Sequence, residues 1–255
     1  MKRYKVLFVL LTTLCSLLPT VLFAQMTWTQ ATANAGWSIR YGHTSVVFDN
    51  KMWVMGGSDI SGYNRNDVWY SSDGVTWTQA TANAGWSARY YHTSVVFDNK
   101  IWVLGGSYNR NDVWYSSDTG VTWTQATANA GWSGRGGHTS VVFDNKIWVL
   151  GGYTNYNNLN DVWYSSDTGV TWTQATANAG WSARQSHTSV VFDNKIWVIG
   201  GFDPSYRNDV WYSTDGVNWT QATANAGWSA RYGHTSVVFN NKIWVIGGYD
   251  ANGFF

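Results

Sequence analysis

The feature that most constrains this chain is an eleven-residue segment, WTQATANAGWS, which recurs five times without a change. The copies start at Trp28, Trp77, Trp123, Trp172 and Trp219, at spacings of 49, 46, 49 and 47 residues. Self-similarity at a period of about 40–50 residues is typical of arrays in which each repeat forms one small sheet. The chain is therefore expected to fold as an all-β array of near-identical units.

Each repeat contains four short segments rich in Val, Ile, Trp, Tyr and Thr, a composition that favours strands. In the repeat that begins at Arg184 they read HTSVVF, KIWVIGG, NDVWYS and VNWTQA, and we name them segments a, b, c and d. Segment b is apolar at consecutive positions, as in 147–150, so both of its faces need a neighbouring sheet. Placing the repeats around an axis covers both faces, which predicts a β-propeller of four-stranded antiparallel blades.

The alignment of the repeats sets the expected domain boundaries. A propeller is predicted over residues 25–255, opened by a segment d at 26–33. The four complete blades and the partial fifth blade that follow are expected at 40–87, 89–133, 135–182, 184–229 and 231–255. Since the sequence reaches Phe255 where the next segment c is due, we expect a fragment or an incomplete ring, with further blades or domains C-terminal to it.

The first 24 residues have the features of a secretory signal peptide. A basic start is followed by an apolar run, by Pro19 and by a predicted cleavage after Ala24. An uncleaved anchor is the alternative, because the run approaches the roughly 18 residues that span a bilayer. A lipoprotein signal at Cys15 is a third interpretation, although the small residue expected before that cysteine is absent. The expected location is secreted, periplasmic or at the cell surface, with no membrane insertion after cleavage.

Charge and residue composition together argue against two kinds of interaction, binding of nucleic acid and disulfide bonds. The chain has no Glu, and Cys15 is its only cysteine. After cleavage it carries 13 basic side chains against 15 Asp, a net charge of −2. We therefore expect no nucleic-acid partner, because no basic surface exists to neutralise phosphates, and no disulfide framework.

Paired glycines that end segment b, followed by a Trp-Tyr segment and then by a lone Trp, resemble kelch repeats. The glycine pairs are Gly56-Gly57, Gly105-Gly106, Gly151-Gly152, Gly200-Gly201 and Gly247-Gly248. The resemblance covers residues 26–255 and implies a β-propeller. The c to d turns, as in Ser116-x-Asp118-x-Gly120, are similar to the Asp-box of sialidase-type propellers, in which Ser and Asp oxygens hold turn amides.

The same resemblance raises two enzyme chemistries that the residues do not support. Galactose oxidase binds copper at a Tyr-Cys cross-link, and sialidases use a Tyr-Glu pair with an arginine triad. A mature chain without Cys or Glu cannot build either site. No cofactor, metal or catalytic residue is therefore expected.

Three polar residues occur once in every repeat and receive structural interpretations. Each histidine is expected to form a hydrogen bond between blades, in preference to a ring of metal ligands. Each arginine is expected to pair with an aspartate of a neighbouring blade, in preference to a ring that binds a ligand. The residues are His43, His92, His138, His187, His234; Arg40, Arg89, Arg135, Arg184, Arg231; and Asp67, Asp112, Asp161, Asp209.

Differences between the repeats are concentrated in the b to c loop and in the pair of residues after the repeated arginine. In an antiparallel blade both connections leave from the same end, so the divergent residues are expected on one face. Tyr and Arg are enriched where proteins bind partners, and Tyr rings also stack on sugars. The predicted ligand-binding residues are Tyr41, Tyr63, Arg65, Tyr90, Tyr91, Tyr108, Arg110, Tyr153, Tyr156, Tyr206, Arg207 and Tyr232.

These residues predict a secreted or cell-surface binding or adhesion module, without catalysis, for a protein or glycan ligand. The alternatives are a kelch-propeller enzyme acting on sugars, of the mutarotase or lyase type, and a structural spacer in a larger surface protein. Random drift in unconstrained loops is the competing explanation of the tyrosines.

Overall fold

The structure is a computed structural model of the 255-residue chain, and it describes residues 28–107 and 109–254. Within these ranges every regular element is a strand, and no helix has the length and apolarity needed to cross a bilayer. The chain divides into a short unit, Met1–Ala31, and the unit Thr32–Phe255, which contains every strand formed by the described residues. The predicted leader, Tyr108 and Phe255 lie outside the described residues.

Four complete antiparallel blades follow one another in this second unit, each in the strand order a-b-c-d. The first blade comprises β2 (Thr44–Phe48), β3 (Lys51–Asp59), β4 (Asn64–Ser71) and β5 (Thr78–Thr81), and β1 (Arg40–Tyr41) also pairs with β3. The second comprises β6 (Thr93–Phe97), β7 (Lys100–Gly106), β8 (Arg110–Ser116) and β9 (Thr124–Thr127). The third comprises β10 (Thr139–Phe143), β11 (Lys146–Tyr153), β12 (Asn158–Ser165) and β13 (Thr173–Thr176). The fourth comprises β14 (Thr188–Phe192), β15 (Lys195–Asp203), β16 (Ser205–Ser213) and β17 (Thr220–Thr223).

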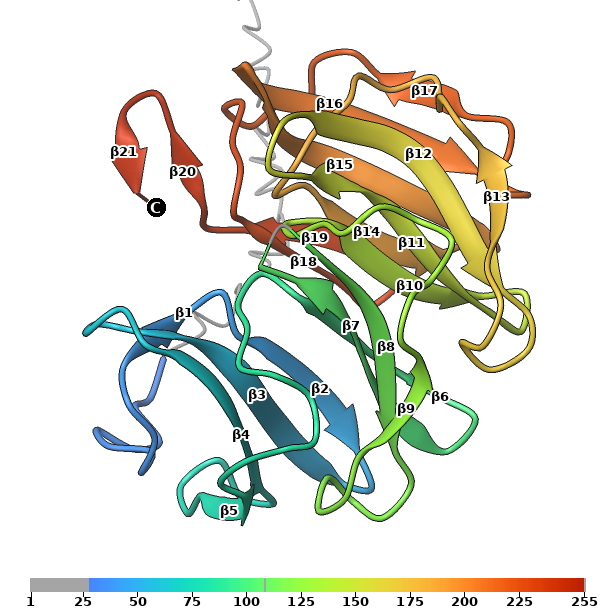
Figure 1. Ribbon diagram of the computed structural model, residues 1–255. Helices are drawn as coiled ribbons and strands as arrows, with labels where there is room; N and C mark the ends of the chain where they lie inside the picture. The colour runs from blue at the N-terminus through green and yellow to red at the C-terminus, as the bar shows by residue number, and fades with distance from the viewer. Residues whose placement is uncertain (1–27, 108, 255) are drawn as a thin grey trace, which may run out of the picture. The chain divides into compact units, whose positions relative to one another are not determined.

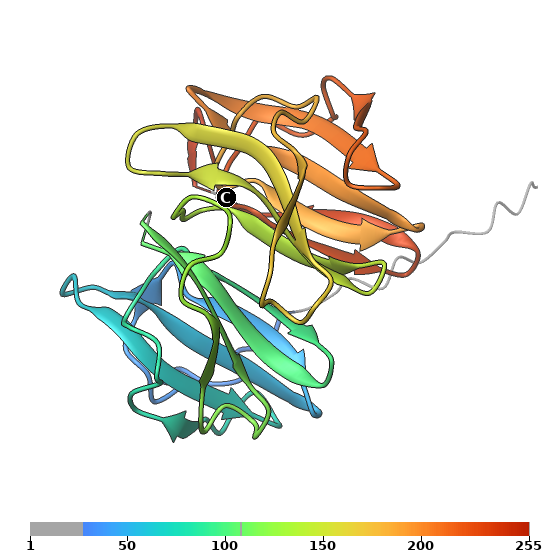
Figure 2. The same cartoon turned by 45° about the vertical axis from the view of Figure 1, so that its right-hand side comes forward.

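The blades are arranged as a propeller, as the sequence predicts. The innermost strands β2, β6, β10, β14 and β18 (Thr235–Phe239) contact one another in succession (Figures 1 and 2). The fifth blade is partial: β18 pairs with β19 (Lys242–Ile246), and a separate hairpin of β20 (Tyr249–Asp250) and β21 (Gly253–Phe254) follows. The predicted fold class is confirmed.

Local sequence explains the two conformations that shape each blade. The Asp-Asn turn between strands a and b has positive φ at both residues, 49° at Asp144 and 54° at Asn145, a conformation these residue types tolerate. In strand b the register shifts at the glycine pair, between Leu150 and Gly152. Gly152 has φ of 102°, and a Cβ there would lie 2.6 Å from the Cβ of His138. The glycine pair is therefore required by both backbone conformation and close packing.

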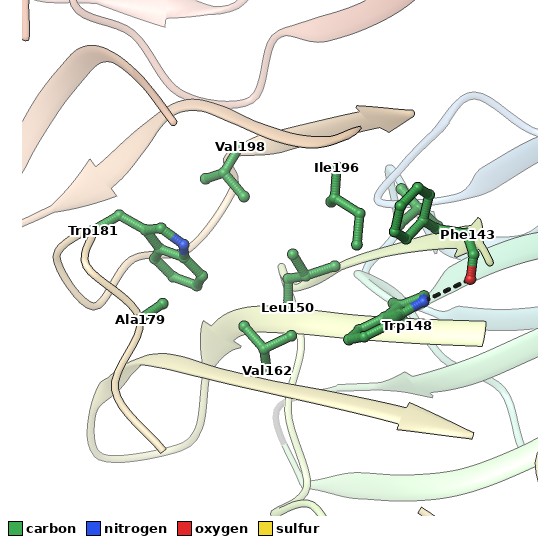
Figure 3. Packing of buried hydrophobic residues seen from close by; sticks show 9 residues of the cluster. Phe143, Trp148, Leu150, Val162, Ala179, Trp181, Ile196 and Val198 are labelled. Carbon is green, nitrogen blue, oxygen red and sulfur yellow. Dashed lines mark hydrogen bonds between the residues drawn. The ribbon is translucent and has the colours of Figure 1, made fainter. Parts of the chain in front are cut away.

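The core lies between blades, because strand b buries both of its faces against different neighbours. In Figure 3, Trp148 and Leu150 of the third blade pack with Ile196 and Val198 of the fourth. The opposite face of the third blade, with Ile147 and Val149, packs against the second. Burial of such side chains contributes about 25 cal/mol per Å² of apolar surface, so each blade is stabilised mainly by its neighbours.

Strand d begins later than expected. In the complete blades it covers only the TQAT residues, as in Thr173–Thr176, and the preceding tryptophan lies outside the ladder. Trp172 instead packs edge-on against Trp132, with ring centroids 5.8 Å apart. The strand expected over 26–33 is not formed at residues 28–33. In complete blades strand d pairs only with strand c, and no such partner precedes this copy within the described residues.

The partial fifth blade exposes side chains that its counterparts bury. Phe239, Trp244 and Ile246 are 65%, 43% and 48% exposed. The equivalent Phe143, Trp148 and Leu150 are 7%, 3% and 0% exposed, because the next blade covers them. Equivalent residues of two nearly identical segments are thus buried or exposed according to whether a neighbouring blade covers them.

This difference predicts unequal effects of one substitution at two equivalent sites. Trp148→Ala should lower the free energy of unfolding by about 3–5 kcal/mol, since it leaves a cavity between two blades. Trp244→Ala should cost less than about 1 kcal/mol because the ring is already partly in solvent. Both indoles donate to the carbonyl of the preceding Phe, at 2.9 and 3.0 Å, so the pair is matched. Equal losses in urea denaturation would contradict burial between blades as the source of stability.

Candidate functional site

The two divergent segments of each repeat lie side by side, at one end of the blades. Tyr41 pairs with Ser58 in the first blade, and Gly136 with Tyr153 in the third. In the fourth repeat Gln185 bridges to Phe202, and in the fifth Tyr232 bridges to Tyr249. The residue after each repeated arginine therefore lies against the residue that opens the b to c loop, as the antiparallel order predicted.

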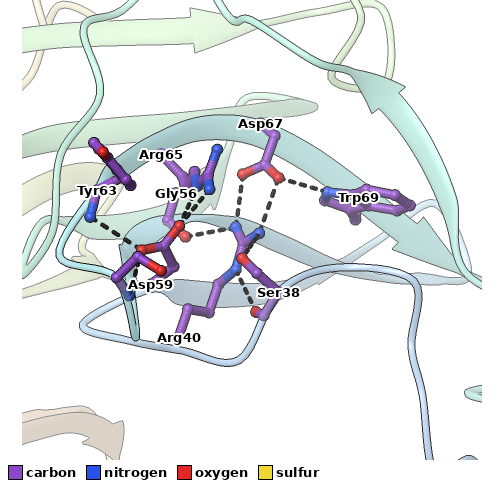
Figure 4. Close-up of polar contacts among 9 residues, drawn as sticks. Ser38, Arg40, Gly56, Asp59, Tyr63, Arg65, Asp67 and Trp69 are labelled. Atoms are coloured by element: carbon purple, nitrogen blue, oxygen red, sulfur yellow. Dashed lines mark hydrogen bonds and ion pairs between the residues drawn. The ribbon is translucent and has the colours of Figure 1, made fainter.

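The repeated arginines of the four complete blades are engaged in the scaffold. The Arg40 guanidinium donates to both carboxylate oxygens of Asp67, at 2.6 and 2.9 Å, and to the Gly56 carbonyl at 2.9 Å (Figure 4). Arg89, Arg135 and Arg184 repeat this arrangement and have no exposed surface. Buried guanidinium groups with these partners do not form a ligand-binding ring.

The expected ion pairs between blades are in fact within one repeat. Arg40 and Asp67 belong to the same copy, and so do the other three pairs. The blades are linked here by main-chain bonds instead: the Arg89 amide donates to the Arg65 carbonyl at 3.1 Å, and the Arg89 carbonyl accepts from Gly57 at 2.9 Å. Arg89, Arg135 and Arg184 thus link two blades through their backbones, whereas their side chains pair within one blade.

Four of the repeated histidines bridge neighbouring blades, as predicted: His92, His138, His187 and His234. His138 Nε2 lies 3.0 Å from the Thr93 hydroxyl, and His187 Nε2 lies 3.1 Å from that of Thr139. Burial, and then the adjacent arginine, lower the pKa of His92 and of His138 to about 3. Burial and Arg231 lower that of His234 to about 4. These imidazoles are neutral at physiological pH and are engaged in the scaffold.

Two of the three predicted loop arginines form ion pairs with aspartates of their own loops. Arg65 donates through Nε to buried Asp59 at 2.9 Å, and Asp59 also accepts from the amides of Ser61 and Tyr63 (Figure 4). Arg207 Nε donates to buried Asp203 at 2.6 Å, a bond that raises the pKa of Arg207. These aspartates organise the loops, so Arg65 and Arg207 are not free anchors for an anionic ligand.

One group of predicted tyrosines gathers on the first two blades. The rings of Tyr90 and Tyr91 have centroids 5.0 Å apart, and Tyr41 lies 6.2 Å from Tyr90 and 6.1 Å from Tyr91. Tyr41 is 52% exposed. The group is an aromatic surface at the divergent end of the blades.

A second aromatic group is built by the fourth repeat and the start of the fifth. Tyr206 and Tyr232 stack with centroids 5.6 Å apart and an interplanar angle of 14°. Phe202 lies 5.8 Å from Tyr206 and 5.6 Å from Tyr232, and Tyr249 lies 5.9 and 5.6 Å from the same two rings. Phe202 and Tyr249 were not among the predicted ligand-binding residues. Each directly follows a glycine pair and forms a bridge with the residue after the repeated arginine, Gln185 or Tyr232.

A cavity of about 290 Å³ lies beside this second group, and we call it the aromatic pocket. No charged side chain is among its lining residues. They are Tyr91, Gln185, Ser186, Phe202, Tyr206 and Tyr232. Sequence reasoning found the three tyrosines but missed Gln185 and Ser186, whose divergence from the equivalent residues was the available signal.

The other predicted residues lie outside the pocket lining. Tyr63 and Tyr156 are 68% and 85% exposed. Tyr153 pairs with Gly136, and the Arg110 carbonyl accepts from the Arg135 amide at 3.0 Å. Tyr108 is not among the described residues. Over the described part of the chain, no group of three or more His, Cys or Asp side chains could hold a metal ion.

Comparison with known proteins identifies the family. The model described as the KLHDC2/KLHL20/DRC7 Kelch-repeats domain matches residues 42–248. The chain belongs to the kelch-repeat family. This kelch chain is also similar to a solved structure titled "Structure of YjhT", with a TM-score of 0.71 and 17% identity over 87% of this chain and 76% of that one. At this identity the likeness concerns the fold. No match is found among curated proteins.

The buried histidines predict how stability depends on pH. Unfolded, each takes up a proton near its ordinary pKa of 6.5, whereas folded His92 and His138 do so only near 3. The unfolded state therefore binds more protons between these values, and the free energy of unfolding should fall as pH drops below 6.5. Each such histidine contributes up to about 1.4 kcal/mol per pH unit in this window.

Asp73 acts in the same direction at lower pH. Amides of the turn lower the pKa of Asp73 to about 2, so its stabilising bonds are lost as pH falls from about 4 towards 2.

Melting temperature against pH, with proton NMR of the imidazoles, checks the pH range assigned to the histidines. In His138→Gln the dependence below pH 6.5 should be shallower. Imidazole signals of the folded chain that titrate near 6.5 would contradict it.

Proposed function

We propose that this kelch propeller is an exported, non-catalytic binding module whose aromatic pocket holds a neutral sugar residue of a glycan. The observation that carries the proposal is the chemistry of the pocket lining. Aromatic faces combine with one amide, one hydroxyl and the phenol groups, and no lining residue is charged. Sugar rings present apolar C–H faces and hydroxyl groups, which suit such a lining.

Charge around the pocket supports a neutral ligand. Arg207, the predicted cation next to Tyr206 in the sequence, is paired with Asp203, so its use to bind a carboxylate or phosphate would require breaking this bond. Burial, and then neighbouring phenols, raise the pKa values of Tyr91 and Tyr206, so both are neutral hydrogen-bonding groups at physiological pH. An anionic saccharide is therefore a poorer fit than a neutral one.

Binding is favoured over turnover by the state of the polar residues that an enzyme would use. The pocket lining includes no carboxylate or imidazole to serve as acid or base. Arg89 is buried and paired with Asp112, and His92 is buried against Thr44 with a pKa of about 3. The expected residues of a mutarotase or lyase reaction are thus engaged in the scaffold.

The test is binding of the purified chain to a panel of neutral and anionic oligosaccharides. Tyr206→Ala and Tyr232→Ala should each weaken binding of a neutral saccharide by about 10-fold or more, since each removes a face of the central stack. Val121→Ala, at an exposed turn at the opposite end of the blades, is the control and should bind normally. Circular dichroism would verify that the variants remain folded.

Three other outcomes would contradict the proposal or part of it. A protein ligand that docks across the loops should depend on the exposed Tyr63 and Tyr156 and be insensitive to Tyr206→Ala. Failure of every saccharide to bind the native chain would contradict the glycan proposal. Conversion of a bound sugar by the native chain would contradict the non-catalytic role.

A further inference from the structure

Tyr91 is the only large residue among five equivalent residues that share a left-handed backbone conformation. Five equivalent residues, one in each repeat, lie two positions after the repeated arginine. They surround the same axial cavity, and we call them the rim. All have left-handed backbone conformations, with φ between 51° and 63°. The five are Gly42, Tyr91, Gly137, Ser186 and Gly233.

Main-chain hydrogen bonds hold the rim residues in this conformation. The Tyr91 amide donates to the Gly42 carbonyl at 2.8 Å, and the Tyr91 carbonyl accepts from Gly137 at 2.9 Å. The series continues from Ser186 to the Gly137 carbonyl at 2.8 Å and from Gly233 to that of Ser186 at 2.9 Å. Because blade-to-blade bonding fixes the backbone, Tyr91 cannot relax to an ordinary φ without losing two of these bonds.

A large side chain at this φ is costly, and Gly would remove the cost. Left-handed conformations disfavour residues with a Cβ, and glycine adopts them freely. Three of the five repeats have Gly at the rim. Strain of this kind persists where the surrounding structure enforces it and is concentrated at ligand-binding sites.

The side chain of Tyr91 contributes to two cavities. It lines the aromatic pocket with Tyr206 and Tyr232. It also lines a cavity of about 320 Å³ at the axial mouth of the propeller, with the rim residues and the five repeated histidines. Ser186 is the only other residue that lines both cavities, and Tyr91 is the only rim residue with a large side chain.

We infer that Tyr91 is the specificity-determining residue of the aromatic pocket, where it closes the side facing the axial mouth and limits the site to a single sugar ring. The inference rests on the proposed saccharide function. The strained backbone is retained because the ring is needed for this boundary. Without the ring the two cavities merge, and a second sugar ring can extend towards the mouth.

Tyr91→Gly tests this, with Tyr90→Gly as the matched variant for stability. Tyr90 is also half-buried, but its φ is not in the left-handed region. Both substitutions remove one tyrosine ring, and only Tyr91→Gly also relieves strain. We expect Tyr91→Gly to melt no lower than the native chain and at least about 3 °C above Tyr90→Gly, since strain of this kind shifts melting by a few degrees.

Specificity is measured as the ratio of affinities for a disaccharide and its monosaccharide. The probes are methyl β-glucoside, methyl β-galactoside, methyl α-mannoside and methyl β-xyloside, with the corresponding disaccharides. In Tyr91→Gly, binding of the preferred monosaccharide should weaken at least 10-fold, and the disaccharide-to-monosaccharide ratio should rise at least 10-fold. Thr119→Gly is the binding control, because Thr119 has φ of 57° in a turn far from the pocket.

An unchanged ratio in Tyr91→Gly would overturn the inference and leave the proposed function intact. A melting temperature as low as that of Tyr90→Gly would overturn it as well, because the ring would then be retained for packing. If the native chain binds none of the saccharides, the proposed function fails and the inference falls with it.

Discussion

Burial of strand b between two neighbouring blades is the constraint on which this fold depends. Ile147 and Val149 face the second blade, while Trp148 and Leu150 face the fourth, so one strand serves two cores. A single four-stranded sheet cannot cover both faces, and the array must therefore be continuous. The exposed Trp244 and Phe239 show what the same sequence does where no further blade covers it.

This constraint explains why most of the sequence is uniform and where it diverges. Residues of the scaffold, such as the Arg40–Asp67 pair and its repeats, fulfil the same role within each of the four complete blades. The b to c loops and the residues after the arginine lie at one end, beyond the cores, and are free to differ. The aromatic pocket arises from that freedom, since its lining comes from divergent positions in the second, fourth and fifth repeats.

Sequence alone was sufficient for the fold and for the location of the divergent face. Periodicity set the blades, apolar runs set strand b, and the Asp-Asn turns had the positive φ expected of them. The histidine bridges followed from one residue recurring per repeat. Tertiary contacts were less predictable. The Arg–Asp pairs lie within one repeat and not between blades. The tryptophan expected to begin strand d packs instead on another tryptophan, as Trp172 does on Trp132.

The candidate site could be predicted only in part, for physical reasons. Residue type indicated the tyrosines, but the pairing of Arg65 with Asp59 and of Arg207 with Asp203 depends on loop conformation. The contribution of Gln185 depends on which loop lies opposite, and composition does not encode this. The strain at Tyr91 was not predicted, although glycine at three of the five equivalent positions was a sign of a left-handed φ.

The most direct test of the account is a crystal structure of the chain soaked with the neutral methyl glycoside that it binds best. The account predicts electron density for one sugar ring between Tyr91 and the stacked Tyr206 and Tyr232, within hydrogen-bonding reach of Gln185 or Ser186. Density only at the Thr- and Ser-lined end of the axial channel, or on the exposed face of β18 and β19, would contradict the claim that the divergent residues form the binding site.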